Sequence, residues 1–171
     1  MPSRLPRSFY QGDVLDVAPA LLGQYLIRVG PDGKRSRYTI TETEAYRGTE
    51  DLACHTSKGR TARTEVMFGE GGHIYMYLIY GMYWMLNVVC GPAGTPQAVL
   101  FRGILEADGP GKLTRLLELD HGFYGEDLLS SERIWIEESG TAPEYTSTPR
   151  IGIDYAAEPW KSKPWRFLMI L

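Results

Sequence analysis

Alternation of polar and apolar side chains runs through the middle of the chain and predicts β-strands. Residues 37–46, RYTITETEAY, are rich in β-branched and aromatic residues and alternate with period two. One face of this strand carries Tyr38, Ile40, Glu42, Glu44 and Tyr46. Residues 73–91 contain two strand-like runs around a glycine, which predicts a β-hairpin with its turn at 80–82. Shorter strands are predicted at 24–29, 97–106, 133–137, 149–153 and 164–167.

Two helices are predicted on either side of these strands. Asp16 is a suitable N-cap for a helix over 17–22, and Gly109 precedes an amphipathic helix that runs to Leu119. Residues 47–72 are polar, punctuated by glycine and too long for an ordinary connection, so we expect a functional loop there. Because strands outnumber helices and do not alternate with them, we predict an α+β fold with a mostly antiparallel sheet.

Composition then limits the class of protein. A chain of 171 residues, 43% of them hydrophobic, fits one domain over 1–171 with a buried core. The net charge of −3 excludes a basic protein that coats nucleic acid through its overall charge. Cys54 and Cys90 form no CxxC pair and the three histidines match no metal-ligand spacing, so we expect neither metal nor cofactor. We find no leader or membrane-spanning stretch, so a soluble cytoplasmic protein is expected.

Two carboxylates on one strand face are the first candidate for chemistry. Glu42 and Glu44 share that face with Ile40 and Tyr46, although burying an unpaired carboxylate is very costly. A solvated face explains such a pair simply, whereas the flanking side chains and the polar loop that follows favour the wall of a cleft. Side chains at i and i+2 lie roughly 6.6 Å apart on a strand. That is near the low end of the separation in inverting glycosidases, about 6.5–9.5 Å.

The tyrosines of the predicted hairpin form a second candidate site. His73, Tyr75, Tyr77 and Ile79 share one face of its first strand. Aromatic faces there can hold a planar ring, which is worth about 1–3 kcal/mol per nucleobase. Tyr80 stands beside the turn glycine, and a bulky ring at a rigid tip can wedge into a base stack. For any single tyrosine, a place in the core is the simpler explanation.

Basic residues cluster in the long loop. Lys58, Arg60 and Arg63 lie close together in the sequence and form the local basic patch nearest to the candidate cleft. Such a patch can seat phosphates, although most clusters of this kind are solvated surface. Glu65 follows at once and reduces the positive charge.

A series of short motifs runs through most of the chain in a fixed order. The series begins with ETEAY, a following Asp-x-x-x-His, an R-T-x-R…MF segment and a Y-x-Y-x-x-YGM…N hairpin, and LFRGILE, GPGKL, PRIGI and PWRF follow. Together these motifs closely resemble the alkyladenine (3-methyladenine) DNA glycosylase family. The resemblance covers about residues 10–168. It implies a compact single-domain fold, with a curved sheet, flanking short helices and a protruding hairpin. It also implies a monofunctional enzyme that hydrolyses the bond between a damaged purine and deoxyribose.

The resemblance implies catalytic roles for two residues. Glu44, the second glutamate of ETEAY, matches the general base that activates water, and Arg102 matches an arginine near the target nucleotide. We expect direct hydrolysis with inversion, without a covalent intermediate, metal or cofactor. The expected partner is double-stranded DNA carrying 3-methyladenine, 7-methylguanine or hypoxanthine, bound by a monomer in the cytoplasm (at the nucleoid if the protein is bacterial).

Further positions match the family's residues for base and DNA binding. Tyr46 and Tyr77 match the rings that sandwich a flipped base, His55 matches the ring at the pocket edge, and Asn87 matches the asparagine that disfavours the exocyclic amine of guanine. Tyr80 matches the residue that fills the vacated space in the duplex. We expect the loop residues Arg60 and Arg63 to contact the DNA backbone.

Some positions depart from the family pattern and leave alternatives open. Thr64 stands where asparagine is expected, and Glu65 and Glu70 stand in a segment usually richer in basic residues. One alternative is a non-catalytic nucleic-acid-binding module, and another is a hydrolase of free nucleosides. A terminal amine at Pro2 after removal of the first residue is a further candidate nucleophile, with nothing to tie it to the cleft.

Overall fold

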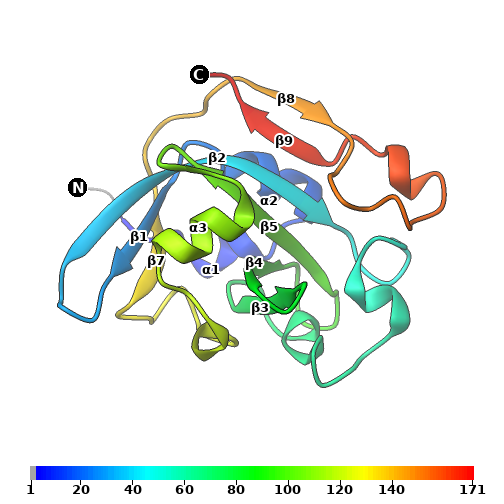
Figure 1. Cartoon of the computed structure of the whole chain (residues 1–171), viewed down its shortest axis with the longest axis horizontal. Helices are drawn as coiled ribbons and strands as arrows, with labels where there is room; N and C mark the ends of the chain where they lie inside the picture. The colour runs from blue at the N-terminus through cyan, green and yellow to red at the C-terminus, as the bar shows by residue number, and fades with distance from the viewer. Residues whose placement is uncertain (1–2) are drawn as a thin grey trace.

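The structure is a computed structural model and describes residues 3–171. An antiparallel sheet of nine strands forms the framework of this part of the chain (Figure 1). Its main path runs β3-β4-β5-β2-β1-β7. Off this path, β9 pairs with β2, β8 pairs with β9, and β6 folds back on β5. The strands are β1 (Tyr25–Val29), β2 (Arg35–Tyr46), β3 (Ile74–Ile79), β4 (Tyr83–Cys90), β5 (Gln97–Ile104), β6 (Ala107–Asp108), β7 (Ile134–Glu137), β8 (Tyr145–Thr148) and β9 (Arg166–Met169).

The long strand β2 connects the two halves of this sheet. One edge of β2 pairs with β5, and the other pairs first with β1 and then with β9. The register with β5 shifts between Ile40 and Glu42 and again between Glu42 and Thr43. Such irregularities bend a strand and increase its twist, and here they interrupt the regular alternation predicted for this strand. The predicted α+β fold with a curved, mostly antiparallel sheet is confirmed.

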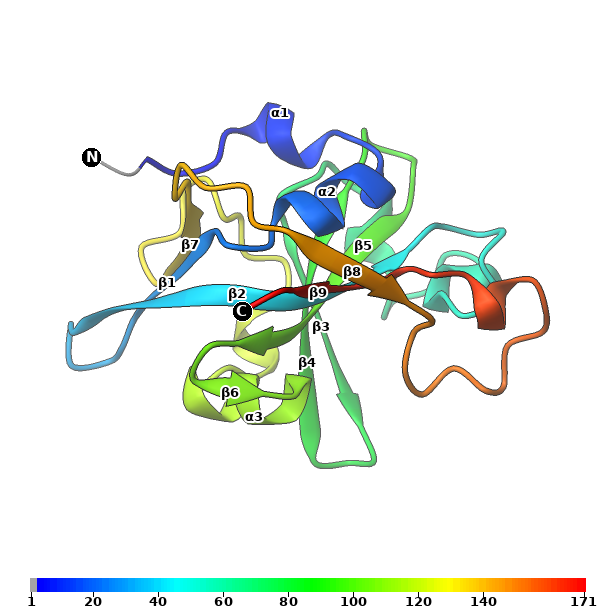
Figure 2. The same ribbon diagram turned by 90° about the horizontal axis from the view of Figure 1, so that it is seen from above.

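Short helices cover both sides of the sheet. α1 (Arg7–Tyr10) and α2 (Val14–Ala20) lie on one side of β2, and α3 (Pro110–Leu116) lies on the other (Figure 2). They bury apolar side chains such as Val17 and Leu113 in the main core, which removes apolar surface from water. Within residues 3–171, every helix is too short or too polar to cross a membrane.

Both predicted helices differ from the observed ones in their bounds. α2 is capped by Asp13, whose side chain accepts a hydrogen bond from the backbone N–H of Leu15, and not by Asp16. Asp16 lies in the first turn instead. A carboxylate is favourable at either position, so the sequence alone does not show which of the two aspartates caps the helix. α3 ends earlier than predicted, because Glu118 takes up a left-handed conformation with φ 55°.

The hairpin is confirmed, and it projects from the sheet on the same side as α3 (Figure 2). Its turn places both Tyr80 and Gly81 at positive φ, 52° and 65°. A left-handed conformation costs a residue other than glycine about 1–2 kcal/mol. Unfavourable backbone geometry of this kind is concentrated at functional sites.

The prediction of a strand at 149–153 is wrong. β8 ends just before this segment and occupies a stretch where no strand was predicted. The segment leaves the sheet because the side chain of Arg150 is buried against Asp51 and the N–H of Ile151 bonds to the side chain of Glu44. The other predicted strands are present with ends shifted by a few residues.

The polar loop 47–72 is folded onto the sheet. It contains two short 3-10 helices, η1 (His55–Lys58) and η2 (Glu65–Phe68). The hydroxyl of Tyr124 accepts a hydrogen bond from the N–H of Val66 and so connects η2 to the segment after α3. Pro2 lies outside the described residues.

Candidate active site

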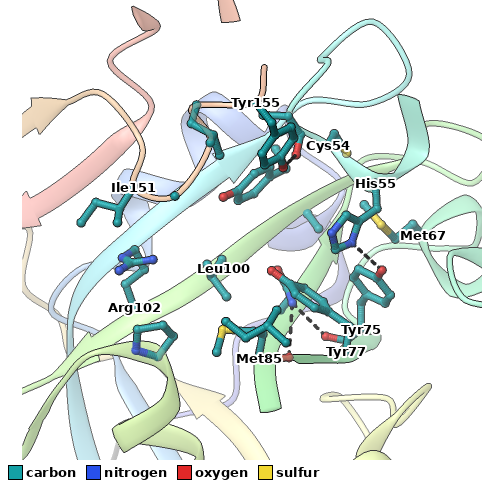
Figure 3. A pocket seen from close by; sticks show the side chains of 18 of the residues that line it. Cys54, His55, Met67, Tyr75, Tyr77, Met85, Leu100, Arg102, Ile151 and Tyr155 are labelled. Atoms are coloured by element: carbon teal, nitrogen blue, oxygen red, sulfur yellow. Dashed lines mark hydrogen bonds between the residues drawn. The ribbon is translucent and has the colours of Figure 1, made fainter. Parts of the chain in front are cut away.

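A pocket of about 550 Å³ opens beside the hairpin, where β5, the end of β2 and residues 151–155 meet (Figure 3). Tyr77 and Asn87 line it from the hairpin, and residues 151–155 form another part of its wall. Most of its lining is apolar or aromatic, with a few polar groups from His55, Asn87 and Arg102. Its size and this mixture are typical of sites for small organic groups.

The carboxylate of Glu44 lies directly behind the lining of this pocket and is fully buried. Its Oε1 accepts a hydrogen bond of 2.9 Å from the hydroxyl of Tyr46, and its Oε2 accepts one of 2.7 Å from the backbone N–H of Ile151. Nη1 of Arg102 lies 3.7 Å from Oε1. All three partners of Glu44 line the pocket, so they couple this carboxylate to whatever occupies it.

Burial raises the pKa of Glu44 above its ordinary value, because desolvation penalises the charged form. The positive charge of Arg102 and the hydrogen bonds from Ile151 and Tyr46 act in the opposite direction. A buried carboxylate with a raised pKa is a better proton acceptor than an exposed one. The arrangement therefore suits a general base.

Arg102 extends from β5 between two carboxylates. Its Nε donates a hydrogen bond of 3.2 Å to Oε2 of Glu42, while its Nη1 faces Glu44. The two glutamates were predicted to share one face of a strand, but the guanidinium gives them different surroundings. Glu42 contacts two arginines, Arg102 and Arg166, whereas Glu44 accepts hydrogen bonds from a phenol and a backbone amide.

The two tyrosines expected on either side of a bound base both line the pocket, Tyr46 from the end of β2 and Tyr77 from β3. Burial and the neighbouring carboxylate of Glu44 raise the pKa of Tyr46 well above its ordinary value, so its hydroxyl stays a donor to Glu44. The guanidinium of Arg63 lies over the ring of Tyr77, 5.2 Å from its centroid. Arg63, expected at the DNA backbone, therefore lies at the edge of the pocket.

His55 stands at the same edge and is electrically neutral at ordinary pH. Burial and the positive charges of Arg63 and Lys58 lower its pKa to about 4. Its Nδ1 lies 2.8 Å from the hydroxyl of Tyr75, and its ring contacts Tyr77 edge to face. A neutral imidazole can present a donor on one nitrogen and an acceptor on the other, which suits recognition of a heteroaromatic ring.

Asn87 is held by the backbone of the hairpin. Its amide nitrogen donates to the carbonyl oxygens of Tyr75, at 3.1 Å, and of Met85, at 3.4 Å. Two acceptors on one side fix the orientation of the amide, so its oxygen is the polar atom that remains for the pocket.

The remaining predicted residues lie outside the pocket's centre. The ring of Tyr80 at the hairpin tip is 87% exposed, and it reaches the pocket rim. Arg60 forms two hydrogen bonds with Glu65, at 2.7 and 2.6 Å, in solvent. Glu65, which departs from the family pattern, thus neutralises Arg60, one of the two arginines that were expected to contact DNA.

Sequence reasoning missed a buried ion pair behind the pocket. Arg150 and Asp51 are both fully buried and make two hydrogen bonds, at 2.6 and 3.0 Å. Arg150 also donates to the carbonyl oxygen of Ala45 and lies over the ring of Tyr46. The signal for this pair was an arginine within the otherwise apolar run PRIGI, and an aspartate four positions before His55.

Tyr155 was missed as well, and it connects two walls of the pocket. Its hydroxyl donates a hydrogen bond of 3.1 Å to the carbonyl oxygen of Ala53. Ala53 packs with Ile153 and Ala156 in a small apolar cluster. Across residues 3–171, no group of three or more histidine, cysteine or carboxylate side chains is placed to hold a metal ion.

Comparison with known proteins gives one consistent answer. The family described as "Methylpurine-DNA glycosylase (MPG)" matches residues 8–107 and 105–170. Relatives from Methanocella arvoryzae and Legionella pneumophila are each 43% identical, over 95% and 96% of this chain and 90% and 93% of their own length. A relative from Bacillus cereus is 42% identical over 95% of this chain and 93% of its own. Each carries the name "Putative 3-methyladenine DNA glycosylase".

These matches confirm the resemblance found in the motifs, and with it the expectation of an enzyme of the DNA glycosylase class. They cover the strand with the two glutamates, the long loop, the hairpin and the segment that carries Arg150. The chain belongs to the methylpurine-DNA glycosylase family.

Proposed function

We propose that this protein is a monofunctional DNA N-glycosylase that releases alkylated or deaminated purines, of the 3-methyladenine, 7-methylguanine or hypoxanthine type. One observation carries the proposal: a buried carboxylate, Glu44, lies directly behind a pocket of about 550 Å³ that tyrosine side chains line. Alkylated purines such as 3-methyladenine carry positive charge. Tyrosine faces attract cations by about 0.5–2 kcal/mol, which favours these bases over undamaged ones.

The target base must leave the duplex to reach such a pocket. Rotating a nucleotide out costs a few kcal/mol, and least for a damaged base. Tyr80 projects from the hairpin tip beside the pocket rim, so its ring can enter the base stack while the rotated base occupies the pocket. The left-handed backbone at Tyr80 supports this role, because the fold alone would favour glycine there.

The hydrolysis follows from the surroundings of Glu44. Each carboxylate oxygen has two lone pairs, and one on each accepts a hydrogen bond from Tyr46 or Ile151. A remaining lone pair accepts a proton from water as the water oxygen bonds to C1′ of the sugar. The C1′–N bond breaks and its electron pair leaves with the base. A positively charged base such as 3-methyladenine leaves as a neutral molecule, whereas hypoxanthine leaves as an anion and takes up a proton from water. Attack on the face opposite the base gives inversion without a covalent intermediate.

The same geometry gives Arg102 an electrostatic role. Its Nη1 lies beside Glu44 and its side chain lines the pocket, so it favours the ionised form of the carboxylate. Its positive charge would also attract the phosphate of a nucleotide whose base occupies the pocket. No metal or cofactor takes part in this proposed reaction.

We further propose that the protein acts as a monomer on double-stranded DNA in the cytoplasm, at the nucleoid in a bacterial cell. Arg63 at the pocket edge and the more distant Arg60 would contact phosphates. Because the whole chain carries a net charge of −3, these local contacts supply the electrostatic part of binding.

The proposal is tested by measuring base release from three substrates: a duplex with hypoxanthine or 3-methyladenine, the same duplex without the lesion, and the free nucleosides. We expect release from the lesion duplex alone. Cleavage of free nucleosides with no action on the duplex would instead indicate a nucleoside hydrolase. Binding to the duplex without any base release would indicate a non-catalytic module.

A further inference from the structure

We propose that Glu42, the first glutamate of the ETEAY motif, is a positioning residue that orients Arg102 toward Glu44. The inference rests on the proposed function and extends it to a residue to which neither the motif resemblance nor the proposed reaction gives a role. The structure places Glu42 one step further from the pocket than Arg102, so it acts through that arginine and not on substrate.

The contacts of Glu42 support this role. Its Oε2 accepts a hydrogen bond of 3.2 Å from Nε of Arg102 and one of 2.7 Å from Nε of Arg166. The side chains of Glu42 and Arg102 are only 10% and 15% exposed, so solvent screens this ion pair weakly. Two guanidinium groups thus converge on one carboxylate oxygen that is nearly buried.

The geometry of Arg102 explains why it needs such a partner. A free arginine side chain samples many rotamers, but its planar guanidinium is fixed once one edge is bound. With Nε held by Glu42, Nη1 lies 3.7 Å from Oε1 of Glu44, which is ion-pair distance and longer than a hydrogen bond. Arg102 therefore stabilises the charge of Glu44 without occupying the lone pair that the proposed reaction reserves for water.

Removing Glu42 has a defined consequence in this arrangement. Glu42, Glu44, Arg102 and Arg166 together carry two negative and two positive charges. Without the charge of Glu42, Arg102 has one nearby carboxylate left, that of Glu44. Arg102 would then form a direct ion pair with Glu44 or leave it, and both results misplace the group that the reaction needs.

Arg166 provides a matched control within the same cluster. It binds the same oxygen of Glu42, at the shorter distance, and within residues 3–171 its other side-chain partner is the hydroxyl of Thr148. Loss of Arg166 therefore removes a partly buried charge next to Glu42 while Arg102 keeps its position. A purely structural role of Glu42 would make Arg166 as important as Arg102.

The test is a double-mutant cycle with Glu42→Gln, Arg102→Gln and the double variant, in the full chain on duplex DNA with hypoxanthine. The single-turnover rate at saturating enzyme is measured separately from the affinity for lesion DNA, and thermal unfolding confirms folding. We expect Glu42→Gln to lower the rate about tenfold or more, since a misplacement of about 1 Å can cost about a hundredfold. The affinity should change less than the rate, and the double variant should be no slower than Arg102→Gln.

Controls make the outcome unambiguous. Arg166→Gln should keep nearly the wild-type rate. Glu42→Asp keeps the charge but shortens the side chain, so it should also be slow, and it replaces Glu42→Gln in the cycle if that variant does not fold. Rate effects that multiply in the double variant, or an equal loss in Arg166→Gln, would overturn the inference while leaving the glycosylase proposal intact. A wild-type protein that releases no base would overturn the proposed function itself.

Discussion

The backbone N–H of Ile151 donates a hydrogen bond of 2.7 Å to Oε2 of Glu44, although 107 positions separate the two residues in the sequence. Glu44 belongs to the central strand β2, whereas Ile151 lies in the segment that leaves the sheet after β8. The buried ion pair of Arg150 with Asp51 fixes that segment. The proposed base is therefore oriented by a part of the chain that lies far from the motif containing it.

The pH dependence of base release should reflect the raised pKa of Glu44. The base must be ionised, so we expect the rate to fall as the pH drops through an apparent pKa above the ordinary glutamate value, since burial raises it. Arg102→Gln should move this acid limb to higher pH, because the charge of Arg102 lowers the pKa of Glu44. The measurement is the single-turnover rate between about pH 4 and 9. An acid limb that does not move in this variant would argue against the assignment.

Folding stability should decrease in mild acid because of His55. Its pKa is about 4 in the folded protein, against about 6.5 in the unfolded chain. The unfolded chain therefore binds more protons in this window, and stability present above about pH 6.5 is lost as the pH falls toward 4. His55→Asn should reduce this loss by up to about 3 kcal/mol in urea unfolding at several pH values.

The buried ion pair behind the pocket should contribute strongly to the stability of the fold. Asp51→Asn leaves the guanidinium of Arg150 without its charge partner in a fully buried place. Breaking such a pair costs about 3–5 kcal/mol. Chemical denaturation should show this loss as a lower midpoint with an unchanged slope. Glu65→Gln breaks the exposed pair with Arg60 and should leave the midpoint near that of the wild type.

The exposed ring at the hairpin tip should matter for DNA and little for the fold. Tyr80 is 87% exposed, so Tyr80→Ala should change the free energy of unfolding by less than about 0.5 kcal/mol. The same variant should weaken extrusion of the damaged base. Fluorescence of 2-aminopurine placed beside the lesion reports this extrusion directly. Tyr145→Ala, at an exposed tyrosine on β8, is the matched control and should extrude the base normally.

The elements predicted best from the sequence are those with strong local patterns. Alternation over 37–46 and the glycine at position 81 gave β2 and the hairpin nearly with their observed bounds. Segment 149–153 was misread because its apolar residues resemble a strand, while its actual partners come from other elements. The buried pairing of Arg150 with Asp51, and the bond from Ile151 to Glu44, link positions about a hundred residues apart. Local periodicity carries no information about such contacts.

The sequence predicts which residues belong to the site, but not the contacts that these residues make with one another. The motifs identified Glu44, Tyr46, Tyr77 and Asn87, and the structure brings all four to one pocket or directly behind it. From their spacing on one strand, Glu42 and Glu44 were predicted to lie in the same surroundings. The side chain of Arg102, from β5, gives them different partners, and only the pairing of β2 with β5 reveals this.

The central claim is that the carboxylate of Glu44 drives base release, and Glu44→Gln tests it most directly. The amide keeps the shape of the side chain but cannot accept a proton from water. In single-turnover reactions on duplex DNA with hypoxanthine, we expect the variant to bind the lesion duplex as the wild type does. Its rate of base release should fall by about a hundredfold or more. Release at nearly the wild-type rate by a folded, DNA-binding variant would contradict the account.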